Sequence, residues 1–347
     1  MSPLTLTMLL SALGLGTTIT FSSSHWLLAW MGLEMNTLAI IPLMAKSFHP
    51  RAVEASTKYF ITQAAAAALI LFAATTDAWA TGQWLTHQLT SPSAATMVTL
   101  ALSLKLGLAP LHFWLPEVLQ GLDLMTCLIL STWQKLAPLA LLLQIPPPAP
   151  AIIIFLALSS MLVGGWGGLN QTQLRKVLAY SSIAHLGWML VVIQFLPSLT
   201  LLSLALYIIM TSSTFLVMHV NTTTSVASLS TSWSKSPCIT AVFPVLVLSL
   251  GGLPPLSGFM PKWLILHELS KQHLPALATL SALSALLSLY FYLRLSYSMT
   301  LTTSPATPGS SAPWRFPYLT LTSPLAFTVS LTALLLPLTP SILALFP

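Results

Sequence analysis

Long stretches of this 347-residue chain contain no charged side chain, and that absence limits its possible folds more than any other feature. The whole chain has 12 Lys and Arg and 6 Asp and Glu residues, 5% of its length, whereas a soluble protein carries about 25%. Polar side chains are too few to cover a water-soluble surface. The composition therefore predicts an integral membrane protein and excludes soluble enzymes, nucleic-acid-binding proteins and disordered chains.

Polar residues, prolines and charges divide the chain into eleven apolar segments, most of them near the roughly 20 residues that cross a bilayer as a helix. They cover residues 3–21, 26–45, 57–77, 94–121, 124–144, 150–169, 174–195, 199–221, 238–269, 274–297 and 320–345. We therefore expect an all-α polytopic membrane protein with about 11 transmembrane helices in a single transmembrane domain, residues 1–347. The two longer connections, residues 221–237 and 302–317, are expected to be irregular loops.

Basic residues predict the orientation of these segments. Eight lie in loops on the same side as the N-terminus, whereas Lys271 lies on the opposite side. The eight are Lys46, Arg51, Lys58, Arg175, Lys176, Lys235, Arg294 and Arg315. Because such residues stay on the side of synthesis, we expect the N-terminus to face the compartment where the chain is made and the C-terminus to lie opposite.

A motif of eleven residues occurs twice, 145 residues apart. Residues 107–117 (GLAPLHFWLPE) match residues 252–262 (GLPPLSGFMPK) at a glycine, two prolines, two leucines and an aromatic position. Proline lacks a backbone donor and clashes with the preceding turn, so each long segment is expected to break into two half-helices. The copies lie in the fourth and ninth segments, an odd offset of five, so they run in opposite directions. This predicts inverted repeats, residues 1–145 and 146–300, followed by a C-terminal helix at 320–345. The alternative is a chance match of two ordinary proline kinks.

Four charged residues, Glu34, Lys105, Lys135 and Lys262, lie at mid-depth in apolar segments rather than near their ends. Because a buried charge is costly, they are expected to face a cavity, a partner or water. Burial disfavours the charged form, so each group is poised to change protonation state when a neighbouring charge moves, as a proton relay requires. The alternatives are a structural ion pair for Glu34 and snorkelling of the lysines, above all Lys262, to the membrane surface.

Two histidines are further candidates for the relay. His112 follows Lys105 by seven residues, a spacing that predicts one shared helix face, and His185 lies midway along its segment. A neutral imidazole donates from one nitrogen and accepts at the other, so it can pass protons between lysines; a packing role is an equal alternative. Glu117 and Asp123 are expected to be solvated near a membrane surface.

The cysteines give no sign of a cofactor. Cys127 and Cys238 belong to no CxxC motif and no Cys/His cluster, so iron–sulfur, zinc and disulfide sites are unsupported. The glycines of residues 164–168 lack GxGxxG spacing and follow no predicted strand. We expect no metal or cofactor site in this chain.

Several motifs together resemble a known family. They are SHWLLAWMGLEMNT (24–37), HPRAVEA (49–55), KLGLAP (105–110), GLNQTQLRK (168–176) and GGLPPLSGFMPKW (251–263). With these motifs the chain closely resembles, over essentially its whole length, the antiporter-like membrane-arm subunits of mitochondrial NADH:ubiquinone oxidoreductase, respiratory complex I, in a vertebrate, fish-like form. The resemblance implies a shortened antiporter-like fold with inverted repeats and two discontinuous helices. It also implies a proton path through Glu34, Lys105, Lys135 and Lys262.

The function implied by this resemblance is proton translocation across the mitochondrial inner membrane, coupled to electron transfer from NADH to ubiquinone. The N-terminus would face the matrix and the C-terminus the intermembrane space. NAD, FMN, iron–sulfur clusters and ubiquinone would bind to other subunits, with no cofactor in this chain. The implied partners are other complex I membrane-arm subunits, including neighbouring antiporter-like subunits, and membrane lipids, but no nucleic acid.

Two other functions stay open from the sequence. A stand-alone cation/proton antiporter would share the fold and the lysines. A purely structural membrane subunit would need no charges inside its spans, so the four found here argue against it.

Overall fold

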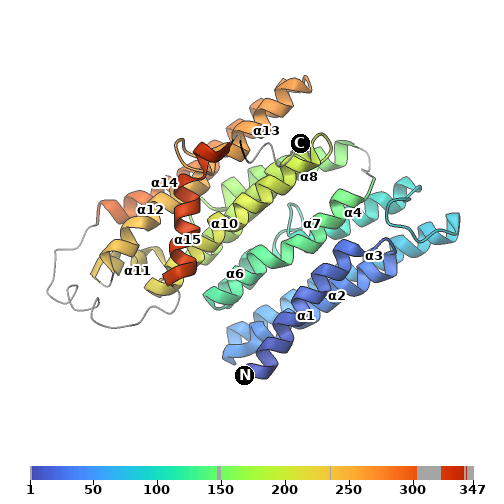
Figure 1. Ribbon diagram of the computed structural model, residues 1–347, viewed down its shortest axis with the longest axis horizontal. Coiled ribbons are helices and arrows are strands. Elements are labelled where there is room, and N and C mark those ends of the chain that lie inside the picture. The colour runs from blue at the N-terminus through green and yellow to red at the C-terminus, as the bar shows by residue number, and fades with distance from the viewer. Residues whose placement is uncertain (1, 147–149, 235, 303–321, 340, 342–347) are drawn as a thin grey trace. The chain divides into compact units, whose positions relative to one another are not determined.

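The computed structural model describes residues 2–146, 150–234, 236–302, 322–339 and 341. Throughout this part of the chain the regular elements are helices, and the β-structure is limited to two isolated bridges, His25 to Leu85 and Gln173 to Ser225. The predicted all-α class is therefore confirmed. The helices form two compact units, Met1–Ala157 and Leu158–Pro347 (Figure 1).

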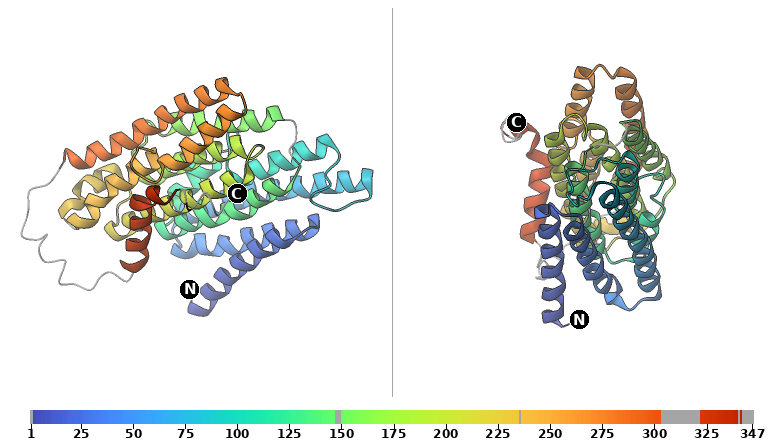
Figure 2. Two further views of the ribbon diagram at one scale, coloured as in Figure 1. Left: turned by 45° about the horizontal axis from the view of Figure 1, so that its top comes forward. Right: turned by 90° about the vertical axis from the view of Figure 1, so that its right-hand side faces the viewer.

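The first unit is built from long helices joined by short turns. Its elements are α1 (Pro3–Ser22), α2 (Trp26–Met44), the 3-10 helix η1 (Ala45–Ser47), α3 (Pro50–Thr81), α4 (Pro92–Leu106), α5 (Trp114–Gly121), α6 (Leu124–Thr132), the 3-10 helix η2 (Trp133–Lys135), α7 (Leu136–Gln144) and the start of α8 (Pro150–Gly167). Within it α1 packs on α2, α2 on α3, and α3 on α4 (Figure 2).

The second unit has the same helical character. Its elements are α9 (Leu174–Val192), α10 (Pro197–Asn221), α11 (Val226–Ser230), the 3-10 helix η3 (Thr231–Ser234), α12 (Pro237–Gly251), α13 (Phe259–Lys271), α14 (Pro275–Thr300), α15 (Thr322–Leu334) and the 3-10 helix η6 (Leu336–Leu338). Helix α10 packs against α9, α12, α13 and α15, and α12 packs against α14. Helix α10 is therefore the central element of this unit.

Two predicted connections need comment. The prediction of an irregular loop at 221–237 is wrong in its middle, because Ser225 and Ser228 form a reciprocal capping box that starts α11. Of the predicted loop at 302–317, residues 303–317 lie outside the described residues. The predicted helix at 320–345 corresponds to α15, and its positions 320, 321, 340 and 342–345 also lie outside them.

Seven of the described helices are long and apolar enough to cross a membrane. They are Pro3–Ser22, Trp26–Ser47, Pro50–Thr81, Leu124–Gln144, Pro150–Gly167, Pro197–Asn221 and Pro275–Thr300. Three shorter apolar helices, Pro92–Leu106, Pro237–Gly251 and Ser323–Leu334, accompany them. These lengths support a multi-pass membrane protein.

Helices α4 and α12 have matching ends. Each has 15 residues, begins with a proline in its first turn, where the missing N–H costs nothing, and ends at a left-handed glycine, Gly107 (φ +78°) or Gly252 (φ +77°). The next helices, α5 and α13, begin at Trp114 and Phe259. Each gap contains a cis peptide bond, before Pro110 and before Pro255. All these positions correspond under the 145-residue shift of the sequence motif.

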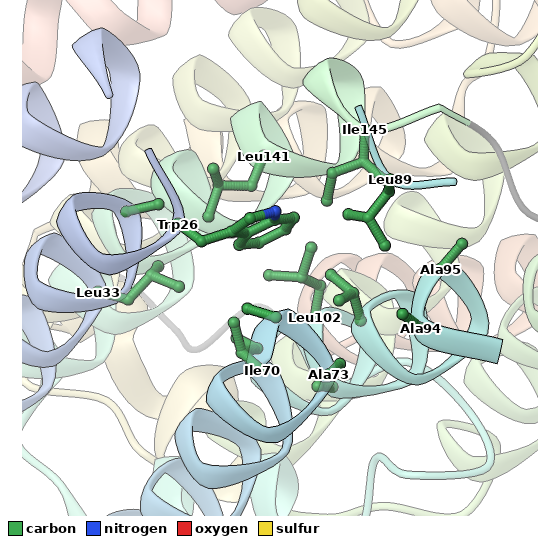
Figure 3. Close-up of a cluster of buried hydrophobic side chains, with 14 of the residues drawn as sticks. Trp26, Leu33, Ile70, Ala73, Leu89, Ala94, Ala95, Leu102, Leu141 and Ile145 are labelled. Atoms are coloured by element: carbon green, nitrogen blue, oxygen red, sulfur yellow. The ribbon is translucent and has the colours of Figure 1, made fainter. Parts of the chain in front are cut away.

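An apolar cluster holds together the helices of the first unit (Figure 3). The Trp26 ring is 2% exposed and lies among aliphatic side chains from α2, α3, α4 and α7, including Leu33, Ile70, Leu102 and Leu141. Close packing of such side chains, rather than exclusion from water, stabilises helix association in lipid. The cluster therefore fixes the helices that carry the candidate site.

Candidate functional site

Glu34, Lys105 and Lys135 lie in the first unit, on three different elements. Glu34 is midway along α2, whose buried face includes Leu33 and Thr37. The Glu34 side chain is half-buried, and its Oε2 atom has no hydrogen-bond partner among the described residues. A carboxylate in this setting depends on a nearby positive charge or on water for stabilisation.

Lys105 lies in the last turn of α4, two residues before Gly107. The residue is 6% exposed, and within the described part of the chain its Nζ atom has no hydrogen-bond partner. The Glu34 carboxylate acts electrostatically on this ammonium group. However, none of the ion pairs shorter than 4.0 Å between described residues joins the two. Glu34 and Lys105 therefore lie farther apart than ion-pair distance.

Lys135 lies at an interruption between two helices. Helix α6 ends at Thr132, the 3-10 turn η2 follows, and α7 begins at Leu136. Pro138 has no N–H to donate to the carbonyl of Gln134, which accounts for the loss of regular helix at this point. Lys135 is 2% exposed, so its amine is deeply buried within the unit.

Lys105 and Lys135 line one small cavity with a volume of about 20 Å³. Three carboxamide side chains, those of Asn36, Gln63 and Gln134, also line it. This space is enough for one water molecule. These three amides were not predicted from the sequence. Their position inside apolar segments was nevertheless a usable signal, because polar groups buried in a membrane protein need partners.

The unpaired polar atoms around this cavity are mainly hydrogen-bond donors. Among the described residues, the Nε2 atoms of Gln63 and Gln134 and the Nζ atom of Lys105 have no acceptor. A group that binds there must accept hydrogen bonds, as a water oxygen does. A water that accepts a proton from Lys105 can release another to Lys135, so one N–H bond breaks as a second forms. The arrangement therefore suits proton transfer between two amines.

His112 does not lie where its spacing predicted. Helix α4 ends at Leu106, so His112 belongs to the irregular segment before α5, and the predicted helix face shared with Lys105 is wrong. The physical reason is the left-handed turn at Gly107, which ends the helical periodicity. His112 is buried, hydrogen-bonds to the backbone of Pro110 and packs against Phe113 with ring centroids 4.4 Å apart.

The other two predicted residues, His185 and Lys262, come together in the second unit. His185 on α9 and Lys262 on α13 line a cavity of about 10 Å³ together with Ser203 of α10. The His185 ring packs against Tyr207, with ring centroids 5.5 Å apart. The Nζ atom of Lys262 donates a 2.7 Å hydrogen bond to the carbonyl oxygen of Gly251, the last residue of α12.

Two other acidic residues, Glu117 and Asp77, make contacts outside the candidate site. Glu117 accepts a 2.8 Å hydrogen bond from Lys58 at an exposed position. Asp77, which the sequence analysis did not single out, is buried, and its Oδ1 atom accepts from the backbone N–H and the hydroxyl of Ser91 at 3.1 and 2.7 Å. This carboxylate stabilises the N-terminus of α4, where the helix dipole favours a negative charge.

The sequence matches family models and known proteins over nearly its whole length. A family model described as "NADH:quinone oxidoreductase/Mrp antiporter, TM" matches residues 23–288, and one described as "NADH dehydrogenase subunit 2 C-terminus" matches residues 289–343. NADH-ubiquinone oxidoreductase chain 2 of Salmo salar is 66% identical over 343 residues, which is 99% of this chain and 98% of that protein. The protein of the same name from Oncorhynchus mykiss is 64% identical over 345 residues, 99% of each chain.

The fold also matches solved structures. A chain of respiratory complex I from Thermus thermophilus with bound aureothin superposes with a TM-score of 0.83 and 28% identity, over 97% of this chain and 79% of that one. A chain of the Mrp complex from Dietzia has a TM-score of 0.73 at 18% identity, over 84% of this chain and 60% of that one, and shows the shared fold alone. By its family-model matches and its identity to the fish proteins, this chain belongs to the NADH-ubiquinone oxidoreductase chain 2 family.

Proposed function

We propose that this chain is a core membrane-arm subunit of respiratory complex I that translocates protons across the mitochondrial inner membrane. Electron transfer from NADH to ubiquinone in other subunits drives the transport. One observation carries the proposal: the buried residues Lys105 and Lys135 line a single cavity with room for one water molecule. Membership of the chain 2 family supports the same function.

The relay uses the predicted residues in order. The negative charge of Glu34 holds a proton on Lys105, and weakening of that interaction lets Lys105 release its proton through water to Lys135. His185 and Lys262, which share a cavity in the second unit, carry later steps. His112, in the segment between α4 and α5, exchanges protons beside the start of the path.

The proposed topology has eleven crossings, with α4/α5 and α12/α13 forming two discontinuous spans in inverted repeats. The matching helix ends at Gly107 and Gly252 support this. Irregular backbone inside a membrane is stable where it lines a protein cavity. The basic-residue distribution supports a matrix-facing N-terminus and a C-terminus in the intermembrane space; of the residues counted, Lys235 and Arg315 lie outside the described residues.

The chemistry of electron transfer is assigned to the rest of the complex. We assign NAD, FMN, iron–sulfur clusters and ubiquinone to other subunits, and this chain supplies only titratable side chains. Its partners are neighbouring antiporter-like subunits of the membrane arm and lipids. Large exposed apolar side chains along the long helices, such as Leu15, Phe72 and Leu283, are suited to such apolar surroundings.

The test is purification of the native membrane complex with and without this chain. The complete complex, reconstituted in vesicles, should couple NADH oxidation by ubiquinone to proton uptake. A preparation lacking the chain should keep NADH oxidation by artificial acceptors and lose coupled uptake. If the isolated chain exchanged cations for protons in liposomes at the rate of the complex, the stand-alone antiporter would be the correct function.

A further inference from the structure

The side chain of Lys262 folds back across the gap between α12 and α13. Its Nζ atom donates to the carbonyl oxygen of Gly251 at 2.7 Å, and its stem lies directly over Gly252. Lys262 belongs to the first turn of α13, so the lysine links the start of one helix to the end of the preceding one. The same side chain also lines the cavity that it shares with His185.

The carbonyl of Gly251 is suited to hold an ammonium group. It is the last carbonyl of α12, where the helix dipole is negative and carbonyls lack intrahelical donors. The N–H of Gly252 donates to the carbonyl oxygens of Leu248 and Ser249, and the N–H of Leu253 donates to the carbonyl oxygen of Leu248. These two N–H groups therefore do not compete with Lys262 for the carbonyl oxygen of Gly251. A charged lysine gains more from this position than a neutral one.

Gly252 has two separate reasons to be glycine. Its φ of +77° is left-handed, and a Cβ atom there would lie 2.8 Å from Cδ of Lys262 and 3.0 Å from both Cε and Nζ. Two other left-handed glycines do not share the second reason. At Gly107 (φ +78°) the nearest atom to an added Cβ is 3.4 Å away, and at Gly82 (φ +74°) nothing lies within 4 Å. Only at Gly252, among these three, would a side chain displace a lysine.

We propose that Gly252 is a positioning residue for Lys262: its missing side chain lets the charged lysine dock on the carbonyl end of α12. Docking holds the protonated lysine at a fixed place, and loss of the proton weakens the attraction and releases the amine. The inference rests on the proposed proton relay, because it concerns how one relay residue is held. Gly252 acts through Lys262 and does not itself carry a proton.

The test distinguishes two reasons for glycine at position 252: space for the Lys262 side chain and a left-handed backbone. Asparagine tolerates left-handed backbone far better than alanine but still has a Cβ atom. In the assembled complex in vesicles, Gly252→Asn and Gly252→Ala should both lower NADH-driven proton uptake at least about tenfold, because a misplacement of about 1 Å can cost 100-fold. The matched variant Gly82→Asn should pump like the wild type. NADH oxidation by artificial acceptors should be unchanged in all three.

Wild-type proton uptake in Gly252→Asn would overturn the proposal, because backbone conformation alone would then explain the glycine. If Gly252→Asn does not assemble, the double variant Gly252→Asn/Lys262→Ala decides. Restored assembly of the double variant would show that the asparagine clashes with the Lys262 side chain. Continued failure to assemble would overturn the proposal. Lys262→Met tests the relay separately: normal pumping in that variant would refute the proposed function, whereas its loss beside normal pumping in Gly252→Asn would refute only this inference.

Discussion

Replacing Lys105 with methionine keeps the length of the side chain and removes the titrating amine. The Lys105 Nζ atom is buried and has no hydrogen-bond partner among the described residues, so its removal breaks no contact of that kind. We therefore expect assembly to be preserved, with the free energy of unfolding changed by no more than about 1–3 kcal/mol, the usual range for a buried polar group that gains or loses a partner. A folding defect is not the expected result.

The effect on transport should be large. A positioned proton carrier contributes roughly 10²–10⁴-fold to a rate, so coupled turnover in Lys105→Met should fall at least about 100-fold, or the complex should pump fewer protons per NADH. Lys105→Arg should not restore pumping, because a guanidinium group does not release its proton near neutral pH. NADH oxidation by artificial acceptors should continue in both variants.

Lys58 offers a matched lysine control for this experiment. It is exposed and pairs with Glu54 at 2.7 Å and Glu117 at 2.8 Å, contacts that solvent screens and that contribute little to stability at a surface. Lys58→Met should therefore pump normally. The assay is NADH-driven proton uptake into vesicles, measured with ubiquinone reduction in the same sample. Normal pumping and turnover in both Lys105 variants would mean that Lys105 is only a structural residue, and the relay would have to be abandoned.

Three further predictions concern the first unit. Gln63→Met removes a donor from the cavity, and coupled turnover should fall about tenfold with assembly intact; an unchanged rate would argue against a bound water there. Gly16→Ala should lower the melting temperature in a thermal-shift measurement, because the added Cβ atom would lie 2.9 Å from the carbonyl oxygen of Gly32. The control Gly14→Ala should melt like the wild type, because nothing lies within 4 Å of its Cβ atom. Asp77→Ala should lower the free energy of unfolding by about 1–3 kcal/mol, because it removes the acceptor for Ser91. Equal melting temperatures of the variant and the wild type would exclude a stabilising role for Asp77 at the start of α4.

Four of the residues identified from the sequence, Glu34, Lys105, Lys135 and Lys262, share one property, a charge inside an apolar segment. Lys105 and Lys135 stand out because burying an amine in a membrane is expensive, and the structure brings both to one cavity. The carboxamides of Asn36 and Gln63 were missed because an uncharged polar residue in a span is less costly and more common. Their importance depends on which helix faces meet, which a single sequence does not specify.

Local spacing was informative only where the helix was continuous. The spacing of seven positions from Lys105 to His112 indicated a shared helix face. Because α4 ends at Gly107, this spacing does not place the two residues on one face. Similarly, the change to a 3-10 turn at Lys135 depends on Pro138 and could not be located by hydropathy alone. In contrast, the ends of α4 and α12 could be predicted closely, because proline and left-handed glycine act through the backbone.

The central claim is that protons pass between two buried lysines in this chain. The most direct measurement is the number of protons taken up per NADH oxidised by complex carrying Lys135→Met, in vesicles and at matched assembly. Lys135 is 2% exposed and lines the same cavity as Lys105, so replacing it acts directly on the proposed path. We predict fewer protons per NADH, or a slower turnover if the steps are obligately linked. A wild-type ratio at a wild-type rate would contradict the account.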